Sequence, residues 1–223
     1  MIPYRASALA VLLGLAALLS SSPAVSAGAG QALITAVMHG QIPRMAILLD
    51  NGVPADTATA KGEFRGKTAL MWAAENGDLQ AITLLLRYGA DVNRLNPKGG
   101  SALMYAAVAG QTEAVEQLIE AGANPNHTVS NGWSPLMLAT VKRHTDSVRR
   151  LVELGADPNM RDVYGWTTLM RAAEQGDEQM VRTLLEVGVD PEASDPTGNT
   201  ALRIAESVGN TEIVRTLKAW GGS

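Results

Sequence analysis

The stretch TALMWAAENGDLQAITLLLRYGADVN, residues 68–93, predicts the fold of this chain. It opens on Thr68, a hydroxyl residue of the kind that caps the free backbone N–H groups at the start of a helix. Residues 69–76 are then mostly apolar, with small alanines that let a neighbouring helix approach closely. Gly77 follows, where a left-handed backbone conformation ends a helix at little cost. The first half of the stretch therefore predicts a short helix of about eight residues.

The second half of the stretch predicts another helix and a turn. Ile82, Leu85 and Leu86 recur at the spacing of one helical face. The sequence GADVN at residues 89–93 supplies the glycine that ends a helix and the Asp and Asn that favour turns. Helices this short are marginally stable alone, so the pair must be stabilised by stacking on neighbouring pairs.

The same pattern returns every 33 residues along the chain. Five glycines lie 33 residues apart: Gly66, Gly99, Gly132, Gly165 and Gly198. A leucine stands four residues after each glycine, at Leu70, Leu103, Leu136, Leu169 and Leu202. An alanine follows three residues later, at Ala73, Ala106, Ala139, Ala172 and Ala205. A second leucine column stands at Leu85, Leu118, Leu151, Leu184 and Leu217. Such agreement indicates a repeat architecture.

The two ends of the array differ from its middle. A sixth copy precedes the five, offset by 37 residues, so that four residues are inserted between Thr57 and Arg65. In the last copy, Lys218 stands where the other copies carry an apolar residue. A charged residue there is typical of a terminal repeat, whose outer face has no neighbour to cover it. The sequence therefore predicts six units.

Residues 68–93 resemble the ankyrin repeat. The family pattern has a hydroxyl residue, Pro, Leu and His at the opening, two alanines and a glycine, an apolar second helix and Gly-Ala-Asp-Val-Asn. The chain departs from it in two columns. The family's His is replaced by Met71, Met104, Met137, Met170 and Arg203, and only Pro135 keeps the family's proline. These departures change how each loop is tied to its helix and leave the resemblance intact.

The resemblance implies an all-α solenoid of stacked helix-turn-helix units, with β-hairpin-like loops projecting along one edge. It covers nearly all of residues 28–223, which we interpret as one ankyrin repeat domain. The expected repeats are approximately 30–61, 66–98, 99–131, 132–164, 165–197 and 198–223.

Residues 1–27 have the order of a secretory signal peptide. Arg5 is their only charge, and residues 6–19 are an apolar run of fourteen. Small residues then lead to Ala27, after which we expect cleavage. An uncleaved anchor is the alternative, but a bilayer-spanning helix needs roughly 20 apolar residues. We therefore expect a periplasmic or secreted protein without a stable membrane anchor once the signal is removed.

Composition excludes several kinds of chemistry. There is no Cys, which removes disulfides, thiolate metal sites and thiol nucleophiles. The 18 Lys and Arg against 22 Asp and Glu give a net charge of −4. This acidic balance argues against nucleic acid as a partner. Aromatic residues make up only 4% of the chain, so its core must consist mainly of Ala, Leu, Val, Ile and Met.

No catalytic, cofactor or metal site is predicted. His39, His127 and His144 fall in different repeats and in different roles, with no shared helix at metal-ligand spacing. His144 is interpreted as a turn residue. The sequence Asn126-His127-Thr128 matches a glycosylation acceptor, but its Asn lies in the turn column, where a bond to the backbone is favoured.

A basic cluster in the fourth repeat suggests an anionic contact. It contains Lys142, Arg143, His144, Arg149 and Arg150. Arg143 replaces the glycine that ends the first helix elsewhere, at a cost of about 1 kcal/mol if the backbone keeps a positive φ. The alternative is a solvated surface that nearby carboxylates neutralise.

The resemblance also implies a binding surface, the concave face made by the loops and the first helices. The residues expected to contact a partner are Trp72, Tyr105, Trp133, Lys142, Tyr164, Trp166 and Arg171. Trp and Tyr often anchor protein interfaces. A polar rim is expected from Lys67, Glu75, Asn76, Lys142, Arg171, Glu174 and Gln175. The alternative for the aromatics is packing, of Trp72 and Tyr105 on adjacent helices and of Trp133 and Trp166 on adjacent loops.

These observations predict a non-enzymatic module that binds another protein outside the cytoplasm and is monomeric by itself. Two other functions stay open at this point. The chain is alternatively a structural stabiliser of a periplasmic enzyme, or an enzyme or metal-dependent factor. The sequence does not indicate which protein is bound.

Overall fold

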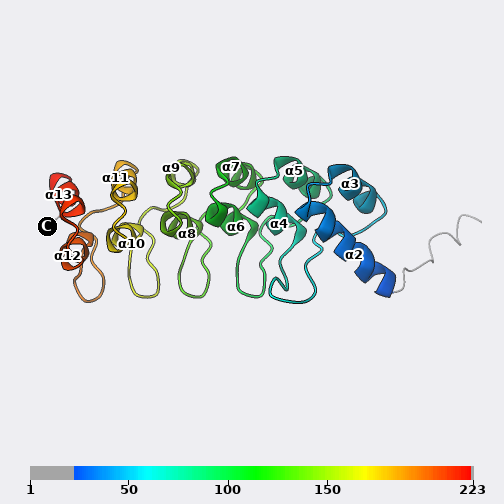
Figure 1. Cartoon of the computed structure of the whole chain (residues 1–223), viewed down its shortest axis with the longest axis horizontal. Helices are drawn as coiled ribbons and strands as arrows, with labels where there is room; N and C mark the ends of the chain where they lie inside the picture. The colour runs from blue at the N-terminus through cyan, green and yellow to red at the C-terminus, as the bar shows by residue number, and fades with distance from the viewer. Residues whose placement is uncertain (1–22, 222–223) are drawn as a thin grey trace, which may run out of the picture.

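The computed structural model describes residues 23–221, which form a single row of stacked helix pairs (Figure 1). Each repeat contributes a first helix and an antiparallel second helix. The first helices are α2 (Pro23–Met38), α4 (Ala69–Asn76), α6 (Ala102–Ala109), α8 (Pro135–Val141), α10 (Thr168–Glu174) and α12 (Ala201–Ser207). The second helices are α3 (Ile42–Asp50), α5 (Leu79–Arg87), α7 (Thr112–Glu120), α9 (Thr145–Glu153), α11 (Glu178–Glu186) and α13 (Thr211–Ala219). The expected all-α stack of six units is confirmed.

The first helices start where the sequence predicts, because each is capped locally. Thr68 accepts a hydrogen bond from the backbone N–H of Met71. In the later repeats the cap residue likewise accepts from the N–H of the residue three positions after it; these caps are Ser101, Ser134, Thr167 and Thr200. The residue that closes the first helix has a positive φ in every repeat. Glycine occupies it in five repeats, with φ of 61–75°. Arg143 occupies it in the fourth, with φ of 64°, and is the only non-glycine with a positive φ among the described residues.

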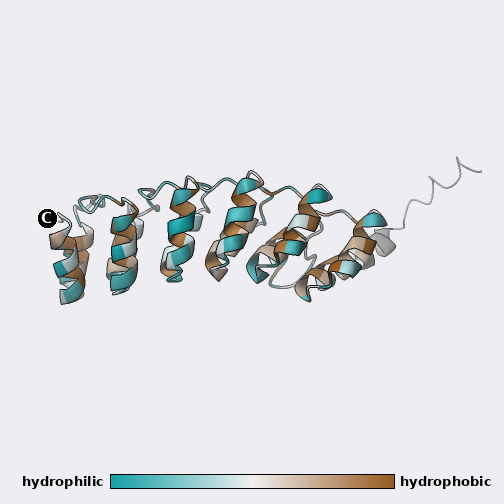
Figure 2. Cartoon of the chain, turned by 90° about the horizontal axis from the view of Figure 1, so that it is seen from above, coloured by the Kyte–Doolittle hydropathy of each residue, from teal (hydrophilic) through white to brown (hydrophobic). Residues whose placement is uncertain are grey.

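The repeated Ala and Leu columns form the core. All five alanines at the centre of the first helices, from Ala73 to Ala205, are fully buried, as are the five leucines of the second column. Figure 2 looks down on the second helices, which carry both hydrophobic and hydrophilic residues. The apolar side of each second helix packs inward; on α7, Ala114, Val115 and Leu118 are the buried residues. Small side chains let the first helices stack closely, which explains how so few aromatics suffice.

The turns between repeats are joined by a ladder of asparagines. Asn126 donates its side-chain amide to the carbonyl of Gly155 at 3.2 Å and accepts from the backbone N–H of Asp157 at 2.8 Å. Asn93 makes the equivalent bonds one repeat earlier. The side chain of Asn126 therefore bonds to backbone, as the turn interpretation predicts.

The N-terminal part of the chain is only partly described. Residues 1–22, which hold most of the expected signal peptide, lie outside the described residues. Helix α2 begins at Pro23 and continues past Ala27, the expected cleavage point. No helix in the described part of the chain is both long enough and apolar enough to cross a membrane.

Candidate binding surface

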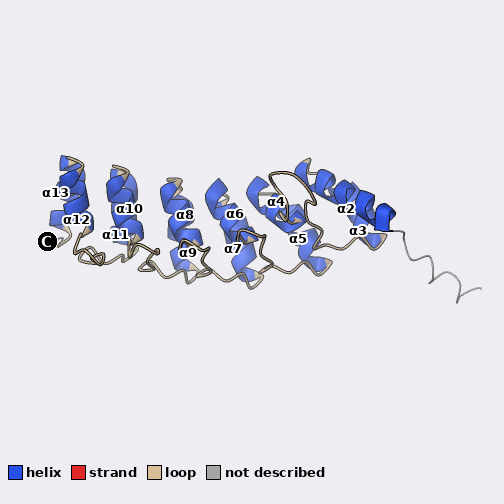
Figure 3. Ribbon diagram, turned by 90° about the horizontal axis from the view of Figure 1, so that it is seen from below, coloured by secondary structure: helices blue, strands red, loops and turns tan. Residues whose placement is uncertain are grey.

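The loops and first helices together form one face of the stack, which we call the front face. It comprises residues 57–77, 94–110, 127–143, 160–176 and 193–209. The loops project from the side of the first helices that lies away from the second helices (Figures 1 and 3). They are loops rather than a sheet: within residues 23–221 the only β-bridges are Ala58 to Thr68 and Ser194 to Thr200. The second helices and the turns that follow them form the back face.

A hollow of about 370 Å³ opens on the front face across the second, third and fourth repeats. Helices α6 and α8 contribute apolar side chains to it, namely Met104, Val108 and Leu138. Two successive loops contribute polar residues, among them Lys98, Ser130 and Asn131, all of which are exposed. A site with apolar walls and polar residues at its edge suits an apolar side chain carried by a polar chain.

A buried lysine closes the N-terminal end of this region. The side chain of Lys67 is only 1% exposed and forms an ion pair with Glu75. Its Nζ lies 3.6 Å from the ring centroid of Trp72 and 4.3 Å from that of Tyr105. Phe64, which the four-residue insertion brings next to Lys67, lies 5.6 Å away and packs edge-on against Trp72. Cation–π attraction and the ion pair together offset part of the cost of burying the charge.

Burial shifts the pKa of two groups in this cluster. Desolvation lowers the pKa of Lys67, and the hydrogen bond and charge of Glu75 only partly oppose it. Desolvation also raises the pKa of the Tyr105 hydroxyl, although a hydrogen bond from Asn96 acts in the other direction. Both shifts follow from burial, which is nearly complete for the side chain of Lys67 and partial for Tyr105.

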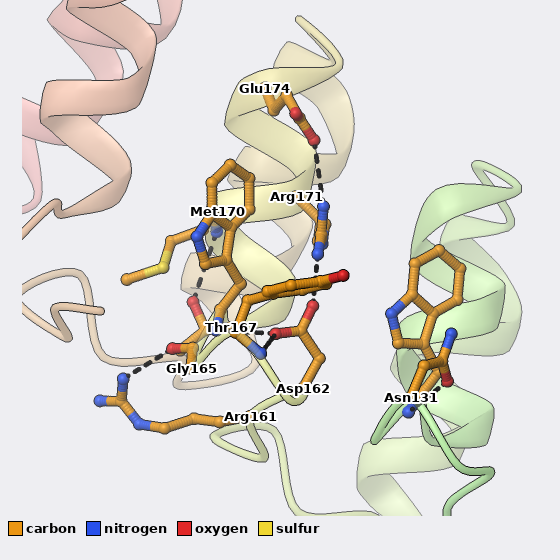
Figure 4. Close-up of polar contacts among 11 residues, drawn as sticks. Asn131, Arg161, Asp162, Gly165, Thr167, Met170, Arg171 and Glu174 are labelled. Atoms are coloured by element: carbon orange, nitrogen blue, oxygen red, sulfur yellow. Dashed lines mark hydrogen bonds and ion pairs between the residues drawn. The ribbon is translucent and has the colours of Figure 1, made fainter. Parts of the chain in front are cut away.

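A second cation–aromatic cluster lies in the fifth repeat, around Arg171 (Figure 4). Its guanidinium carbon is 4.4 Å from the ring centroid of Trp166 and 5.7 Å from that of Trp133 in the preceding loop. Arg171 forms an ion pair with Asp162, whose side chain has no exposed surface, and another with Glu174 at 3.4 Å. The arginine thereby joins the loop of the fifth repeat to α10 and to the fourth-repeat loop.

The environment of Asp162 favours its ionised form. Burial alone would raise its pKa, but the hydrogen bond from Arg171 and those from the backbone N–H groups of Trp166 and Tyr164 outweigh burial and lower it. These N–H groups donate at 3.0 Å and 2.9 Å. The carboxylate thus fixes the conformation of the loop that carries the two aromatic residues.

Comparison with protein families agrees with this architecture. The family model described as "Ankyrin repeats (3 copies)" matches residues 8–96, 76–162 and 155–222, which together cover most of the chain. The chain belongs to the ankyrin repeat family. A comparison with curated proteins finds none that matches it. Ankyrin repeats form protein–protein interaction modules, and proteins built from them are typically non-enzymatic binding scaffolds.

The ankyrin stack places the seven predicted contact residues at very different depths. Trp72 is 8% exposed and donates its indole N–H to Thr59 at 3.1 Å, so it is packed in the stack, as the packing alternative proposed. Tyr105, Trp133 and Trp166 are half-buried, and Arg171 lies between the last two.

Tyr164 and Lys142 are the two predicted contact residues that are exposed. Tyr164 is 68% exposed, and Lys142 is exposed just after α8. The rim prediction for Lys67 is wrong, because its side chain lies under Phe64 and the two helix aromatics. The hollow was not predictable from the pattern of one repeat, because its lining comes from three successive repeats.

The histidines occupy structural positions in the ankyrin repeats. His144 contacts the carbonyl of Val108 in the preceding repeat at 3.0 Å, and His127 contacts the carbonyl of Gly99 in the preceding loop at 2.8 Å. His39 contacts the carbonyl of Thr35 within its own helix. Among the described residues, no group of His, Asp and Glu side chains is arranged to hold a metal ion.

Carboxylates neutralise much of the basic cluster of the fourth repeat. Arg150 pairs with Glu116 and Glu153, and Arg149 with Glu186. Arg143 approaches Asp177 at 3.5 Å. The arginines of this cluster that lie on α9 are therefore better described as a solvated surface neutralised by carboxylates than as a contact for an anionic partner.

Proposed function

We propose that this ankyrin repeat protein binds another protein through its front face and has no enzymatic activity of its own. The observation that carries the proposal is the hollow between the second and fourth repeats, where apolar helix residues meet exposed polar loop residues. It lies beside the buried cluster around Lys67, since Tyr105 belongs to both. Part of its wall is already fixed in the free protein, because Met104 is buried and the hydroxyl of Tyr105 accepts a hydrogen bond from Asn96.

The proposal includes a location outside the cytoplasm. It rests on residues 1–27, whose single positive charge, short apolar run and small residues match an export signal. The absence of Cys suits an oxidising compartment, since no thiol is available for unwanted pairing. Fusing residues 1–30 to a reporter that is active only after export tests this part. An inactive reporter would contradict it.

The binding face is tested by blocking the hollow. Ser130 is exposed at its edge, so Ser130→Trp fills space without disturbing the core. Glu120→Trp adds the same side chain to the exposed surface of α7 on the back face and serves as the matched control. Each protein is used to capture partners from the exported fraction of the source cells, which are then quantified by mass spectrometry.

We expect the wild type and Glu120→Trp to capture the same specific proteins and Ser130→Trp to lose them. Circular dichroism and thermal unfolding establish that both variants keep the fold. Equal capture by Ser130→Trp and the wild type would show that the hollow is not part of the binding site.

A further inference from the structure

Charge is unevenly divided between the two faces of the stack. The front face carries ten Lys and Arg against six Asp and Glu, a net charge of +4. The rest of the chain from residue 28 onward carries seven Lys and Arg against sixteen Asp and Glu, a net charge of −9. The acidic character of the whole molecule therefore comes from the back face, and it conceals a basic front.

The front-face cations are also less neutralised than the front-face carboxylates. Six front cations are exposed and have no carboxylate partner in the described part of the chain: Lys61, Arg65, Lys98, Lys142, Arg161 and Arg203. Most of the front-face carboxylates, in contrast, already form ion pairs. Glu75 pairs with Lys67, Asp162 and Glu174 pair with Arg171, and Glu206 pairs with Lys218. The excess of positive charge on this face therefore resides on exposed cations that ion pairs do not neutralise.

The excess of cations over carboxylates is largest in the segments around the hollow. The front segments 94–110 and 127–143 contain four cations and no carboxylate. Of these cations, Lys98 lines the hollow and Lys142 follows α8, which contributes Leu138 to it. Glu75 also lines the hollow, but its charge is already paired with Lys67. An apolar cavity is thus bordered by uncompensated positive charge.

We propose that the partner presents an acidic segment, with an apolar side chain entering the hollow and carboxylates next to it facing Lys98 and Lys142. This inference rests on the proposed function and specifies the chemistry of what is bound. Complementary charge steers such a segment to the front face, while the acidic back face repels it. The apolar wall of Met104, Val108 and Leu138 favours a peptide side chain over the phosphates of a nucleic acid.

The test is a selection from a random peptide library displayed on phage, using the full chain. Enriched peptides are synthesised, and their affinities are measured by fluorescence anisotropy at two ionic strengths. Lys98→Glu/Lys142→Glu reverses the charge beside the hollow. Arg44→Glu/Arg87→Glu changes the net charge equally on the back face and is the control, because both arginines are exposed on second helices.

We expect enriched peptides to combine acidic residues with a large apolar one. Their affinity should fall as ionic strength rises. It should also fall about tenfold or more in Lys98→Glu/Lys142→Glu, because two favourable charge pairs are replaced by repulsion. It should stay unchanged in the control. An oligonucleotide that displaces the peptides at equal concentration would overturn the inference in favour of a general anion site.

The remaining outcomes separate this inference from the proposed function. The selection could enrich neutral or basic peptides that bind the wild type but not Ser130→Trp. That result would overturn the inference of an acidic segment but support the front face as the binding site. If no peptide is enriched, recognition of a linear acidic segment is wrong, whereas the capture experiment still decides whether the front face binds a folded protein.

Discussion

Arg143 occupies a backbone position that the other five repeats fill with glycine. Its φ of 64° lies in the left-handed region, which costs a residue with a Cβ about 1–2 kcal/mol. In return its guanidinium contacts the carbonyl of Gln175 at 3.2 Å and Asp177 at 3.5 Å. The side chain is 60% exposed, so these contacts stabilise little. Backbone strain at this residue therefore outweighs what its side chain contributes.

Arg143→Gly is expected to raise the free energy of unfolding by about 1 kcal/mol, because the strain is relieved. Urea denaturation followed by circular dichroism measures the change. Arg143→Ala is the control: it keeps the unfavourable φ and loses the guanidinium contacts, so it should be no more stable than the wild type. If Arg143→Gly is less stable than the wild type, the contacts with the fifth repeat outweigh the strain.

Asp162 illustrates the opposite case, a buried charge that the fold requires. Asp162→Asn leaves Arg171 facing a neutral amide, and we expect stability to fall by about 2 kcal/mol. Glu174→Gln removes the half-exposed partner of the same arginine and should cost less than about 1 kcal/mol. Equal losses from the two substitutions would contradict the distinct role given to the buried carboxylate.

Asp162 also predicts a pH dependence. Because its pKa is lower in the folded state, its contribution is complete above the ordinary carboxyl pKa, near 4, and is lost as pH falls through the folded value. The stability difference between the wild type and Asp162→Asn should therefore narrow below about pH 4. A difference that stays constant on acidification would show that Asp162 is not held ionised by the fold.

At the scale of the element, the first helices begin at hydroxyl caps. Ser134 is 1% exposed and accepts the N–H of Met137 at 3.3 Å. Ser134→Ala should lower the stability by about 1 kcal/mol. Ser134→Thr should change it little, because three other repeats hold a threonine in this column. Thermal unfolding distinguishes the two, and equal stabilities would show that the cap bond contributes nothing.

The helices were predictable because the signals that define them are local. A hydroxyl cap, an alanine centre and a closing glycine lie within ten residues of one another, as in residues 68–77. The two cation–aromatic clusters depend instead on neighbouring repeats. Lys67 meets Tyr105 only because adjacent repeats stack, and Phe64 reaches it only through the inserted loop residues. No spacing within one repeat encodes such contacts, so a lysine expected at the rim proved to be buried.

At the scale of the whole molecule, stacking the repeats produces two faces that differ in charge. The second helices and turns collect the acidic residues, and the loops and first helices collect exposed cations around an apolar hollow. Because the repeats share one helix–turn–helix plan, the proposed binding surface is distinguished by residues that vary between repeats, such as Lys98, Ser130 and Lys142. The central claim is that recognition takes place on this front face.

Hydrogen–deuterium exchange of the chain alone and in complex with a captured partner tests that claim most directly. We expect binding to slow exchange in residues 94–110 and 127–143, where the hollow lies, and to leave α7 (Thr112–Glu120) and α9 (Thr145–Glu153) unchanged. Slowed exchange confined to α7 and α9, with the front segments unaffected, would contradict the account.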